Sequence, residues 1–528
     1  MKAAVSLVLS IFSQLVIAQA PVIQWQKTFG GINTDNASSV IEQANGNILI
    51  GGASNSIISG DKAQNFNNFD DFWIINLSNT GATLWQNSFI NTDGGDANNK
   101  VIINNTWDNN FILSGTIYYI DTTGMNLKKM NPSGNLLNLG HTGDHSSCTT
   151  TALLYGTQLS NCYITNENKY ISGGTHLDFG LCDNTYNYYL QKNNTIAGFN
   201  DFIWYKYFRG DQQDILKTFI ETTDDGYIMI GSSNSNIANE KTENSKGQYD
   251  YWIIKINSDG DIVWQKTIGG NDMEDASSII QTVDGGYLIG GSSKSNISGD
   301  KTENSDGDYD YWIVKLDTNG TTEWQKTIGG SLNDKLAALK PTIDGGFILV
   351  GTSNSSISGD KTENSRGLND IWIVKLNNQG TILWDKTIGR SLDDSANDVI
   401  QTNDGGFVVA GTSFSSMSGD KLENSRGNSD YWIIKLNPEN LKINDSEKFS
   451  DIQIYPNPTN GFVSIEFGQN QEKTTITLTN ILGQILSNDT YINTEKTLNY
   501  SIIGENGIYF IHVENDKKEK KTIKVIKK

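Results

Sequence analysis

The sequence of 528 residues contains few cysteines, prolines and histidines: 3 Cys, 6 Pro and 4 His. Three cysteines are too few for a scaffold held together by several disulfides. Six prolines argue against a proline-rich chain, and after the first 20 residues no apolar run is long enough to span a bilayer. Glycine, with 52 residues, and aromatic side chains, at 10%, are abundant instead. This composition is typical of an ordered all-β protein.

Positive charge is also in short supply. The chain has 40 Lys and Arg against 60 Asp and Glu, a net charge of −20. Residues 445–528 contain 10 Lys and 11 Asp and Glu, so nearly all of the excess lies before them. Such a field disfavours binding to nucleic acid or anionic membranes and favours cationic partners or metal ions. The alternative is that the acidic surface only keeps the protein soluble.

Tryptophans recur with a period of 60 residues. Trp264, Trp324 and Trp384 lie in the related phrases WQKTIGG, WQKTIGG and WDKTIGR. A second series lies in phrases such as DYWIIKI and DYWIVKL and keeps the same step. The chain therefore consists largely of tandem copies of one supersecondary unit. The second series is Trp252, Trp312, Trp372 and Trp432.

Each unit reads as four short strands. In the copy from 277 to 330, residues 278–282 and 287–291 flank an Asp-Gly-Gly turn, and residues 311–316 and 322–328 flank Asp-Thr-Asn-Gly. Four antiparallel strands per repeat are typical of a propeller blade. The chain starts with a lone fourth strand at 22–28, and the last repeat, ending at Pro438, lacks one. We therefore expect the strand of Trp25 to pair with Tyr431–Leu436.

The predicted fold class is all-β: a seven-bladed β-propeller closed by an N-terminal strand, followed by a small C-terminal β-sandwich. The start, MKAAVSLVLSIFSQLVIA, has one Lys, a short apolar run and small residues, which is typical of a secretory signal peptide. The predicted domains are the signal peptide at 1–18, the propeller at 19–438, a polar linker at 439–450 and the C-terminal domain at 451–528.

The C-terminal segment carries an ordered set of motifs: YPNP followed by NG, a central LGQ turn, a GIYFIHV strand and a basic last strand. Together they resemble the subtype A C-terminal sorting domain of type IX secretion substrates in Bacteroidetes. The resemblance implies export through the periplasm and outer membrane to the cell surface or medium, with the translocon and a sortase as partners. The repeats also resemble uncharacterised tandem repeats of such proteins. The matching residues are Tyr455, Pro456, Asn457, Pro458, Gly461, Gly483, Gly507 and Tyr509.

The long loops between the second and third strands are the candidate ligand or cation site. They read GDKTENSDGDYD from Gly299, with close copies from Gly359 and Gly419. Ca²⁺, the one candidate cofactor, requires six to eight oxygens, which Asp, Glu, Asn and backbone carbonyls can supply. The alternative is a set of turns that satisfy their own hydrogen bonds. The candidate residues are Asp300, Glu303, Asn304, Asp310, Asp360, Glu363, Asn364, Asp370, Asp420, Glu423, Asn424 and Asp430.

The third repeat, from about residue 140 to 208, departs from the others and holds all of the cysteines. Their spacing matches no common zinc module, so the alternatives are a zinc site, one disulfide with a leftover thiol, or three buried thiols. The residues concerned are Cys148, Cys162, Cys182, His141, His145 and His176.

Common catalytic motifs are absent. The chain has no G-x-S-x-G elbow, H-E-x-x-H helix or P-loop, and its turns lack the Asp-box of sialidase-type propellers. The sequence thus favours an exported, non-catalytic module that binds a glycan, a protein or a surface. The alternative is a secreted glycosidase or lyase that uses loop carboxylates.

Overall fold

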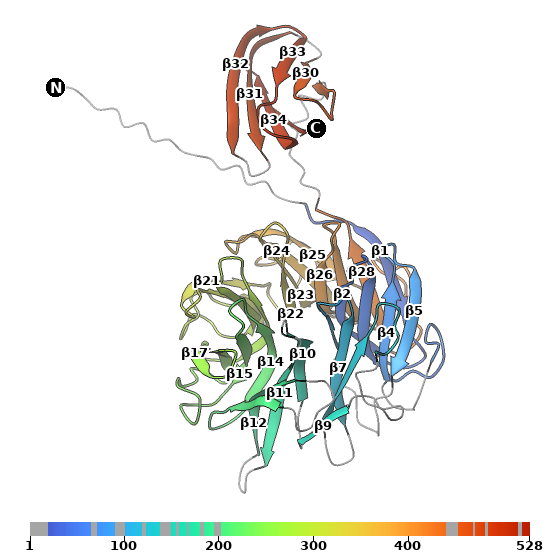
Figure 1. Ribbon diagram of the computed structural model, residues 1–528, viewed down its shortest axis with the longest axis vertical. Coiled ribbons are helices and arrows are strands. Elements are labelled where there is room, and N and C mark those ends of the chain that lie inside the picture. Colours follow the sequence, from blue (N-terminus) through green and yellow to red (C-terminus); the bar gives the residue numbers. More distant parts are fainter. Residues whose placement is uncertain are drawn as a thin grey trace, which may run out of the picture. The chain divides into compact units, whose positions relative to one another are not determined.

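The computed structural model describes residues 19–64, 71–89, 101–118, 123–137, 149–154, 158–165, 167, 169–179, 184–194, 202–439, 452–467, 470–480, 484–515 and 520–528. Within these ranges the regular elements are all β-strands (Figure 1). The chain divides into an N-terminal unit, Ala20–Glu439, and a C-terminal unit that begins after it. The predicted signal peptide and residues 440–450 of the predicted linker lie outside the described residues.

Seven four-stranded antiparallel sheets make up the described part of the N-terminal unit, which is propeller-like. Sheet 1 is β2 (Asp35–Glu42), β3 (Ile48–Ser54), β4 (Asp71–Leu77) and β5 (Thr83–Phe89); sheet 2 is β6 (Ile102–Asn105), β7 (Phe111–Tyr118), β8 (Thr123–Met130) and β9 (Thr149–Leu154); sheet 3 is β10 (Gln158–Ile164), β11 (Tyr170–Phe179), β12 (Asn184–Asn193) and β13 (Phe202–Phe208). Sheet 4 is β14 (Asp214–Glu221), β15 (Tyr227–Ser233), β16 (Asp250–Ile256) and β17 (Ile262–Ile268); sheet 5 is β18 (Glu274–Gln281), β19 (Tyr287–Ser293), β20 (Asp310–Leu316) and β21 (Thr322–Ile328). Sheet 6 is β22 (Asp334–Pro341), β23 (Phe347–Ser353), β24 (Asp370–Leu376) and β25 (Ile382–Ile388); sheet 7 is β26 (Asp394–Gln401), β27 (Phe407–Ser413), β28 (Asp430–Leu436) and β1 (Ile23–Phe29).

The first strand of the chain completes sheet 7. β1 pairs antiparallel with β28, and Trp25 lies opposite Lys435 and Phe29 opposite Tyr431. The predicted pairing of these two segments is therefore present. It gives sheet 7 four strands, like the other six described sheets.

The core lies between neighbouring sheets. Every residue of β20 is buried, although the strand belongs to a single sheet, because its two faces pack on sheets 4 and 6. The third strands are also joined by hydrogen bonds: the Tyr311 hydroxyl donates to the Trp372 carbonyl oxygen at 3.3 Å. Between sheets 7 and 1, the Tyr431 hydroxyl donates to the Trp73 carbonyl at 3.2 Å. Neighbouring sheets thus share both apolar packing and hydrogen bonds.

In sheets 1, 4, 5, 6 and 7 the Trp of the third strand is held by a side chain of the fourth strand. Trp312 is fully buried, and its Nε1–H donates to Gln325 Oε1 at 3.1 Å. The same Gln325 side chain donates from Nε2 to the Asp300 carbonyl at 2.7 Å. One glutamine thus satisfies a buried indole and fixes the long loop against the sheet.

Where a fourth strand carries a Trp, that side chain packs on the following sheet. Trp264 in sheet 4 donates from Nε1 to the Thr318 carbonyl at 3.2 Å, in the last turn of sheet 5. Gly320 in that turn has φ +80°, and a Cβ there would lie 2.8 Å from the Trp264 ring. Trp25 of sheet 7 donates to the Asn79 carbonyl of sheet 1 at 3.0 Å in the same way. The WQKT phrase therefore joins consecutive sheets.

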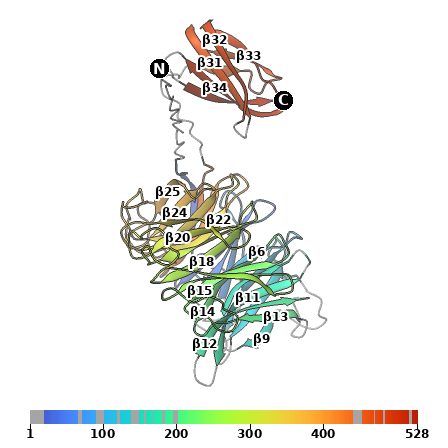
Figure 2. The ribbon, with the colours of Figure 1, turned by 90° about the vertical axis from the view of Figure 1, so that its left-hand side faces the viewer.

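The C-terminal unit contains two described sheets that enclose one core (Figure 2). Its centre includes Ile465, Ile476 and Ile511, all fully buried. This arrangement agrees with the predicted small all-β domain. The first sheet is β29 (Gln453–Tyr455), β30 (Phe462–Glu466) and β33 (Thr497–Ser501), and the second is β32 (Ile485–Thr494), β31 (Gln471–Asn480), β34 (Gly507–Asn515) and β35 (Lys520–Lys527).

Substitution of Gln26 tests how strongly its side-chain hydrogen bonds hold β1 in sheet 7. Its Oε1 accepts hydrogen bonds from Trp432 Nε1 at 2.9 Å and from the Leu422 amide at 3.2 Å. Gln26→Ala leaves a buried indole unsatisfied, so we expect it to lower the free energy of unfolding of the N-terminal unit by about 1–3 kcal/mol. Denaturation followed by tryptophan fluorescence measures this, because all 12 tryptophans lie in that unit.

The matched control is Lys27→Ala. The Lys27 side chain is 41% exposed and forms a 3.5 Å ion pair with Glu423, so its loss should change stability by less than about 1 kcal/mol. An equal loss in both variants would contradict a specific role for Gln26.

Candidate functional site

Alternating strand direction gives every sheet two ends. At the loop end lie the connection from the second to the third strand and the connection to the next sheet, which are residues 294–309 and 329–333 in sheet 5. At the turn end lie the two hairpin turns, at residues 282–286 and 317–321. The predicted candidate residues lie at the loop end of sheets 5, 6 and 7.

The loop carboxylates and amides bind the protein's own backbone. In sheet 5 the Gly269 amide donates to Asp300 Oδ2 at 3.1 Å, and the Thr327 amide donates to Glu303 Oε2 at 2.6 Å. Asn304 Oδ1 accepts from the Ile297 amide at 3.1 Å. The equivalent bonds recur in the next two sheets. In sheet 6 Gly329 donates to Asp360, Thr387 to Glu363 and Ile357 to Asn364. In sheet 7 Gly389 donates to Asp420, Thr28 to Glu423 and Met417 to Asn424.

The remaining three candidates lie away from the surface. Asp310, Asp370 and Asp430 are fully buried where a third strand begins, and each accepts from an amide of its own loop. Burial raises the pKa of Asp310 to about 6, because desolvation disfavours its charged form. The structure therefore brings these carboxylates to the joints between sheets.

The described residues contain no group of three or more His, Cys, Asp or Glu side chains arranged to hold a metal ion. Cys162 is a buried free thiol, and burial raises its pKa. His176 packs on Tyr207 with ring centroids 5.2 Å apart. Cys148, Cys182, His141 and His145 lie outside the described residues, so the zinc and disulfide alternatives stay open.

Thermal unfolding distinguishes the two alternatives for the loops, calcium binding and turns that satisfy their own hydrogen bonds. Because the carboxylates already accept hydrogen bonds from the backbone, we expect the same thermal transition in millimolar calcium and in EDTA. A cation that binds only the folded protein would raise the transition temperature. A rise that Asp300→Asn and Glu303→Gln reduce would instead show that the loops bind calcium.

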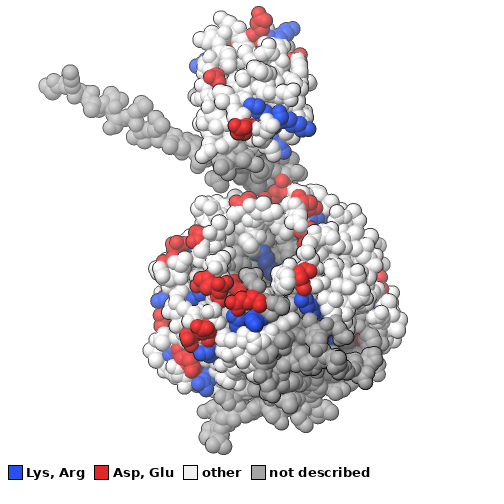
Figure 3. Space-filling view, viewed as in Figure 1, with Lys and Arg blue, Asp and Glu red and all other residues white. Residues whose placement is uncertain are grey.

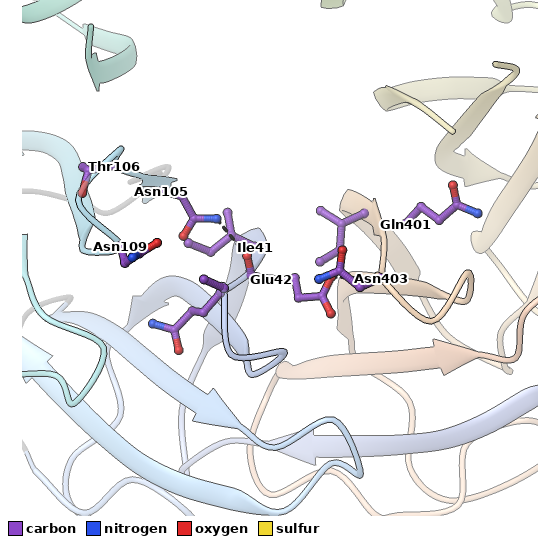
Figure 4. Close-up of a pocket in the computed structure, with 10 residues that line it drawn as sticks. Ile41, Glu42, Asn105, Thr106, Asn109, Gln401 and Asn403 are labelled. Carbon is purple, nitrogen blue, oxygen red and sulfur yellow. Dashed lines mark hydrogen bonds between the residues drawn. The ribbon is translucent and has the colours of Figure 1, made fainter. Parts of the chain in front are cut away.

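A cavity of about 410 Å³ opens at the turn end, between sheets 7, 1 and 2. Figure 4 shows Asn105, Thr106 and Asn109 on one side, Gln401 and Asn403 on the other, and Ile41 and Glu42 between them. Side-chain amides dominate its polar lining. The cavity is lined by Ile41, Glu42, Gln43, Ala44, Asn105, Thr106, Asn109, Ile400, Gln401 and Asn403.

Hydrogen bonds fix the centre of this cavity. The Asn403 amide donates to Glu42 Oε2 at 2.8 Å, and Asn105 Nδ2 donates to the Glu42 carbonyl at 2.8 Å. Gln43 Oε1 accepts from Asn76 Nδ2 at 3.0 Å. Burial raises the pKa of Glu42, and the hydrogen bond from Asn403 offsets part of this increase. Glu42 is the single carboxylate among the lining residues.

Trp107 lies on the turn between β6 and β7, between the lining residues Thr106 and Asn109, and its side chain is 63% exposed. The turn is pinned by the neighbouring Asp108, which forms a 2.7 Å ion pair with Lys129. Hydrogen bonds and this ion pair lower the pKa of Asp108 despite partial desolvation. Sequence analysis missed Trp107 because it belongs to neither tryptophan series.

Charged side chains surround a hollow among the sheets. Figure 3 shows acidic residues gathered on one side of the hollow, with a basic side chain at its base. Ion pairs join neighbouring innermost strands: Lys217 lies 2.9 Å from Asp275, and Lys340 lies 3.4 Å from Asp398. The inner strands are thus joined by charge as well as by packing.

In the C-terminal unit the YPNP motif holds the last strand. Asn457 Nδ2 donates to the Lys524 carbonyl at 2.8 Å, and Asn457 Oδ1 accepts from the Ile526 amide at 2.9 Å. Both X-Pro bonds of the motif, before Pro456 and Pro458, are cis. The other predicted motif residues lie in the same unit. Gly461 has φ +114°, and the Tyr509 hydroxyl donates to the Glu505 carbonyl at 2.5 Å. Gly507 is the first residue of β34, and Gly483 lies outside the described residues.

Residues 453–528 match the family described as "Secretion system C-terminal sorting domain". This segment is a type IX sorting signal. The protein is therefore secreted by the type IX system to the cell surface or extracellular space, and the sorting domain interacts with that machinery. In the described part of the chain, no helix has the length and apolar character needed to cross a membrane.

Other similarities are distant. Regulatory protein FlaEY of Caulobacter vibrioides is 24% identical over 201 residues, which cover 36% of this chain and only 21% of that protein. A PL25 ulvan lyase is 12% identical with a TM-score of 0.45, covering 78% of this chain and 97% of that one. The polysaccharide lyase Uly1 is 10% identical with a TM-score of 0.41, covering 80% and 95%. At these scores the structural likeness carries no argument about function.

Asn457→Ala tests the motif. It removes both hydrogen bonds to β35, so we expect less folded sorting domain and a lower fraction of protein outside the cell, with the remainder in the periplasm. Immunoblots of the medium, surface and periplasm measure this. Asn499→Ala is the control, because Asn499 is exposed and bonds only Ser464 by its side chain. Equal export of both variants would contradict the role of Asn457.

Proposed function

We propose that the protein is a secreted, non-catalytic binding module, in which a closed seven-bladed propeller binds a glycan at its turn end. The sorting domain is of subtype A, and a sortase cuts in the linker. The cavity of sheets 7, 1 and 2, together with the exposed Trp107 on the turn that supplies Thr106 and Asn109 to its lining, carries the proposal.

Contacts between first strands support a closed ring. β2 contacts both β6 and β26, which belong to sheets 2 and 7. The other first strands contact one another in sequence, from β6 through β10, β14, β18 and β22 to β26. Pairing of β1 with β28 leaves sheet 7 with the same four strands as its neighbours. A ring has no terminal sheet whose apolar face would be exposed.

The lining of the cavity supports a sugar ligand. Side-chain amides and one carboxylate can donate to and accept from sugar hydroxyls, while Ile41 and Ile400 add apolar contact. The exposed indole of Trp107 can pack on the C–H face of a sugar ring, and it is rigid enough to do so at low entropic cost. The net charge of −20 and Glu42 disfavour anionic sugars, so the ligand is a neutral glycan.

The same lining argues against glycoside hydrolysis. Both common mechanisms need two carboxyl groups on opposite sides of the scissile bond, roughly 5–10 Å apart. Glu42 is the single carboxylate among the lining residues, and the loop carboxylates of sheets 5–7 bind backbone amides at the other end. The residues of the cavity can therefore hold a sugar but provide no acid–base pair.

Trp107→Ala tests the site. The secreted protein would first be screened on an array of neutral and anionic glycans, and the affinity for a neutral glycan that binds would be measured by calorimetry. We expect the variant to bind roughly thirtyfold more weakly, as for loss of an aromatic anchor worth about 2 kcal/mol.

The matched control is Ile343→Ala, which removes an apolar side chain that is 75% exposed on the corresponding turn of sheet 6. It should leave affinity unchanged. Binding confined to anionic glycans, equal affinity of both variants, or cleavage of the bound glycan would each contradict the proposal.

A further inference from the structure

A belt of buried charge runs through the loop end of sheets 4, 5, 6, 7 and 1. Each of these sheets buries one carboxylate where its first strand begins, one where its third strand begins, and one lysine of the long loop. All fifteen side chains belong to residues that are at most 2% exposed. The carboxylates are Asp214, Asp250, Glu274, Asp310, Asp334, Asp370, Asp394, Asp430, Asp35 and Asp71, and the lysines are Lys241, Lys301, Lys361, Lys421 and Lys62.

At four joints two of these carboxylates come from neighbouring sheets and lie side by side. The Asp334 amide donates to the carbonyl of Tyr309, the residue before Asp310, at 2.6 Å. This backbone bond places the first residue of β22 beside the first residue of β20. The equivalent bonds join Glu274 to Tyr249, Asp394 to Asn369 and Asp35 to Ser429, so the pairs are Asp250/Glu274, Asp310/Asp334, Asp370/Asp394 and Asp430/Asp35.

An amide of the connection between two sheets donates to one carboxylate of the pair, and which member accepts differs between joints. The Gly330 amide donates to Asp334 Oδ2 at 2.7 Å. One sheet further on, the equivalent amide of Arg390 donates to Asp370 Oδ1 at 3.0 Å, and therefore to the other member of its pair. At each of these two joints the connection amide thus serves one carboxylate of the pair, while an oxygen of the other carboxylate, Asp310 Oδ1 or Asp394 Oδ1, is buried without a donor.

Some oxygens at these joints have no hydrogen-bond donor. Asp310 Oδ2 accepts from the Asp306 amide at 2.6 Å, but Asp310 Oδ1 and Asp334 Oδ1 are both buried without a partner. The same holds for Oδ1 of Asp430 and of Asp35. Two ionised carboxylates that face each other in a buried site are unstable, and a shared proton removes one charge and adds one hydrogen bond.

Space at the joint favours a proton over a metal ion. A Cβ on Gly329 would lie 2.0 Å from Asp310 Oδ1, so this oxygen already fills the room beside the glycine. At the other three joints a Cβ on the equivalent glycine would also overlap an aspartate Oδ1. The glycine and aspartate are Gly269 and Asp250, Gly389 and Asp370, and Gly30 and Asp430. A calcium ion needs six to eight oxygens around it, whereas a proton needs only the two carboxylates.

We propose that each of the four joints takes up one proton shared by its two carboxylates, so that the N-terminal unit is most stable at mildly acidic pH. The charged groups that face the Asp310/Asp334 pair are Lys301 from the loop of sheet 5 and Lys361 from the loop of sheet 6, while Asp306 donates its backbone amide to Asp310. Each lysine also faces the second carboxylate of its own sheet, so one lysine serves two buried acids.

The direction of the pH dependence follows from the raised pKa values. Burial raises the pKa of Asp310, Asp394 and Glu274 to about 6. A group with a raised pKa stabilises the fold fully below its ordinary pKa near 4, and this contribution is lost as the pH rises through 6. Desolvation lowers the pKa of Lys301 to about 8, so the lysine titrates above this window. The pKa of turn aspartates such as Asp344 is lowered, so their contribution to stability is present above about pH 4 and is lost as the pH falls below it.

Asp334→Asn tests the proposal in the secreted protein. The amide can donate to Asp310 without a proton, so we expect the transition temperature at pH 7.5 to stay the same or rise. The difference in transition temperature between pH 5 and pH 7.5 should shrink by about a quarter, since one of four joints is altered. Tryptophan fluorescence reports the N-terminal unit alone, because all tryptophans lie there.

The matched control is Asp344→Asn. Asp344 forms a 2.8 Å ion pair with the buried Lys375 at the turn end, so this variant should lose stability at pH 7.5. If Asp334→Asn also lowers the transition temperature at pH 7.5, the second negative charge of the pair stabilises the fold instead of opposing it, and the proposal is overturned.

Two measurements on the unaltered protein add independent outcomes. Calorimetric unfolding at pH 6 in buffers of different ionisation enthalpy should show that folding takes up protons, and no uptake would overturn the proposal. At pH 7.5, equal transition temperatures in sodium, potassium, calcium and EDTA support a proton. A rise with one metal ion, lost in Asp334→Asn, would assign the joints to that ion instead.

Discussion

Burial of the third strand on both faces is the constraint on which the N-terminal unit depends. A strand such as β20, in which every residue is buried, needs an apolar neighbour on each side of its sheet. Trp312 packs towards sheet 4 and Tyr311 towards sheet 6, so no sheet completes its own core. The fourth-strand tryptophans add a second contact of the same kind, because each packs on a turn of the next sheet. Stability is thus a property of neighbouring pairs, as in other repeat proteins.

Dense packing of this kind also forces polar groups into the interior. The ratio of buried lysines to carboxylates differs between the two ends of the sheets. At the turn end each buried third-strand lysine has an aspartate of its own: Lys315 lies 3.0 Å from Asp284, and Lys375 lies 2.8 Å from Asp344. At the loop end one lysine, such as Lys301, stands between two buried carboxylates. Charge is therefore balanced at the turn end and left in excess at the loop end, where a proton can supply the missing positive charge.

Much of the strand pattern could be predicted because it is local. Alternating apolar residues and the turn at Asp284-Gly285-Gly286 define the hairpin of β18 and β19. A lone fourth strand at the start of the array and a missing fourth strand in the last repeat indicate the pairing of β1 with β28. The role of the loop carboxylates could not be read in this way. The sequence shows the acceptor in Glu303, but its donor is the Thr327 amide, 24 residues further on in another strand. Only the fold brings the two together.

The cavity was beyond prediction for a related reason. Glu42 and the Asn403 amide are 361 residues apart, and the turn position of Asn403 is Val283 in sheet 5 and Ile343 in sheet 6. Nothing in one repeat says which turn lines a cavity. Near-identical residues recur because every sheet needs the same contacts with its neighbours. A binding site needs the opposite, a place where one turn differs from the rest. Trp107 stands in such a turn, so in an array of this kind the departures from the repeat are the more informative guide to function.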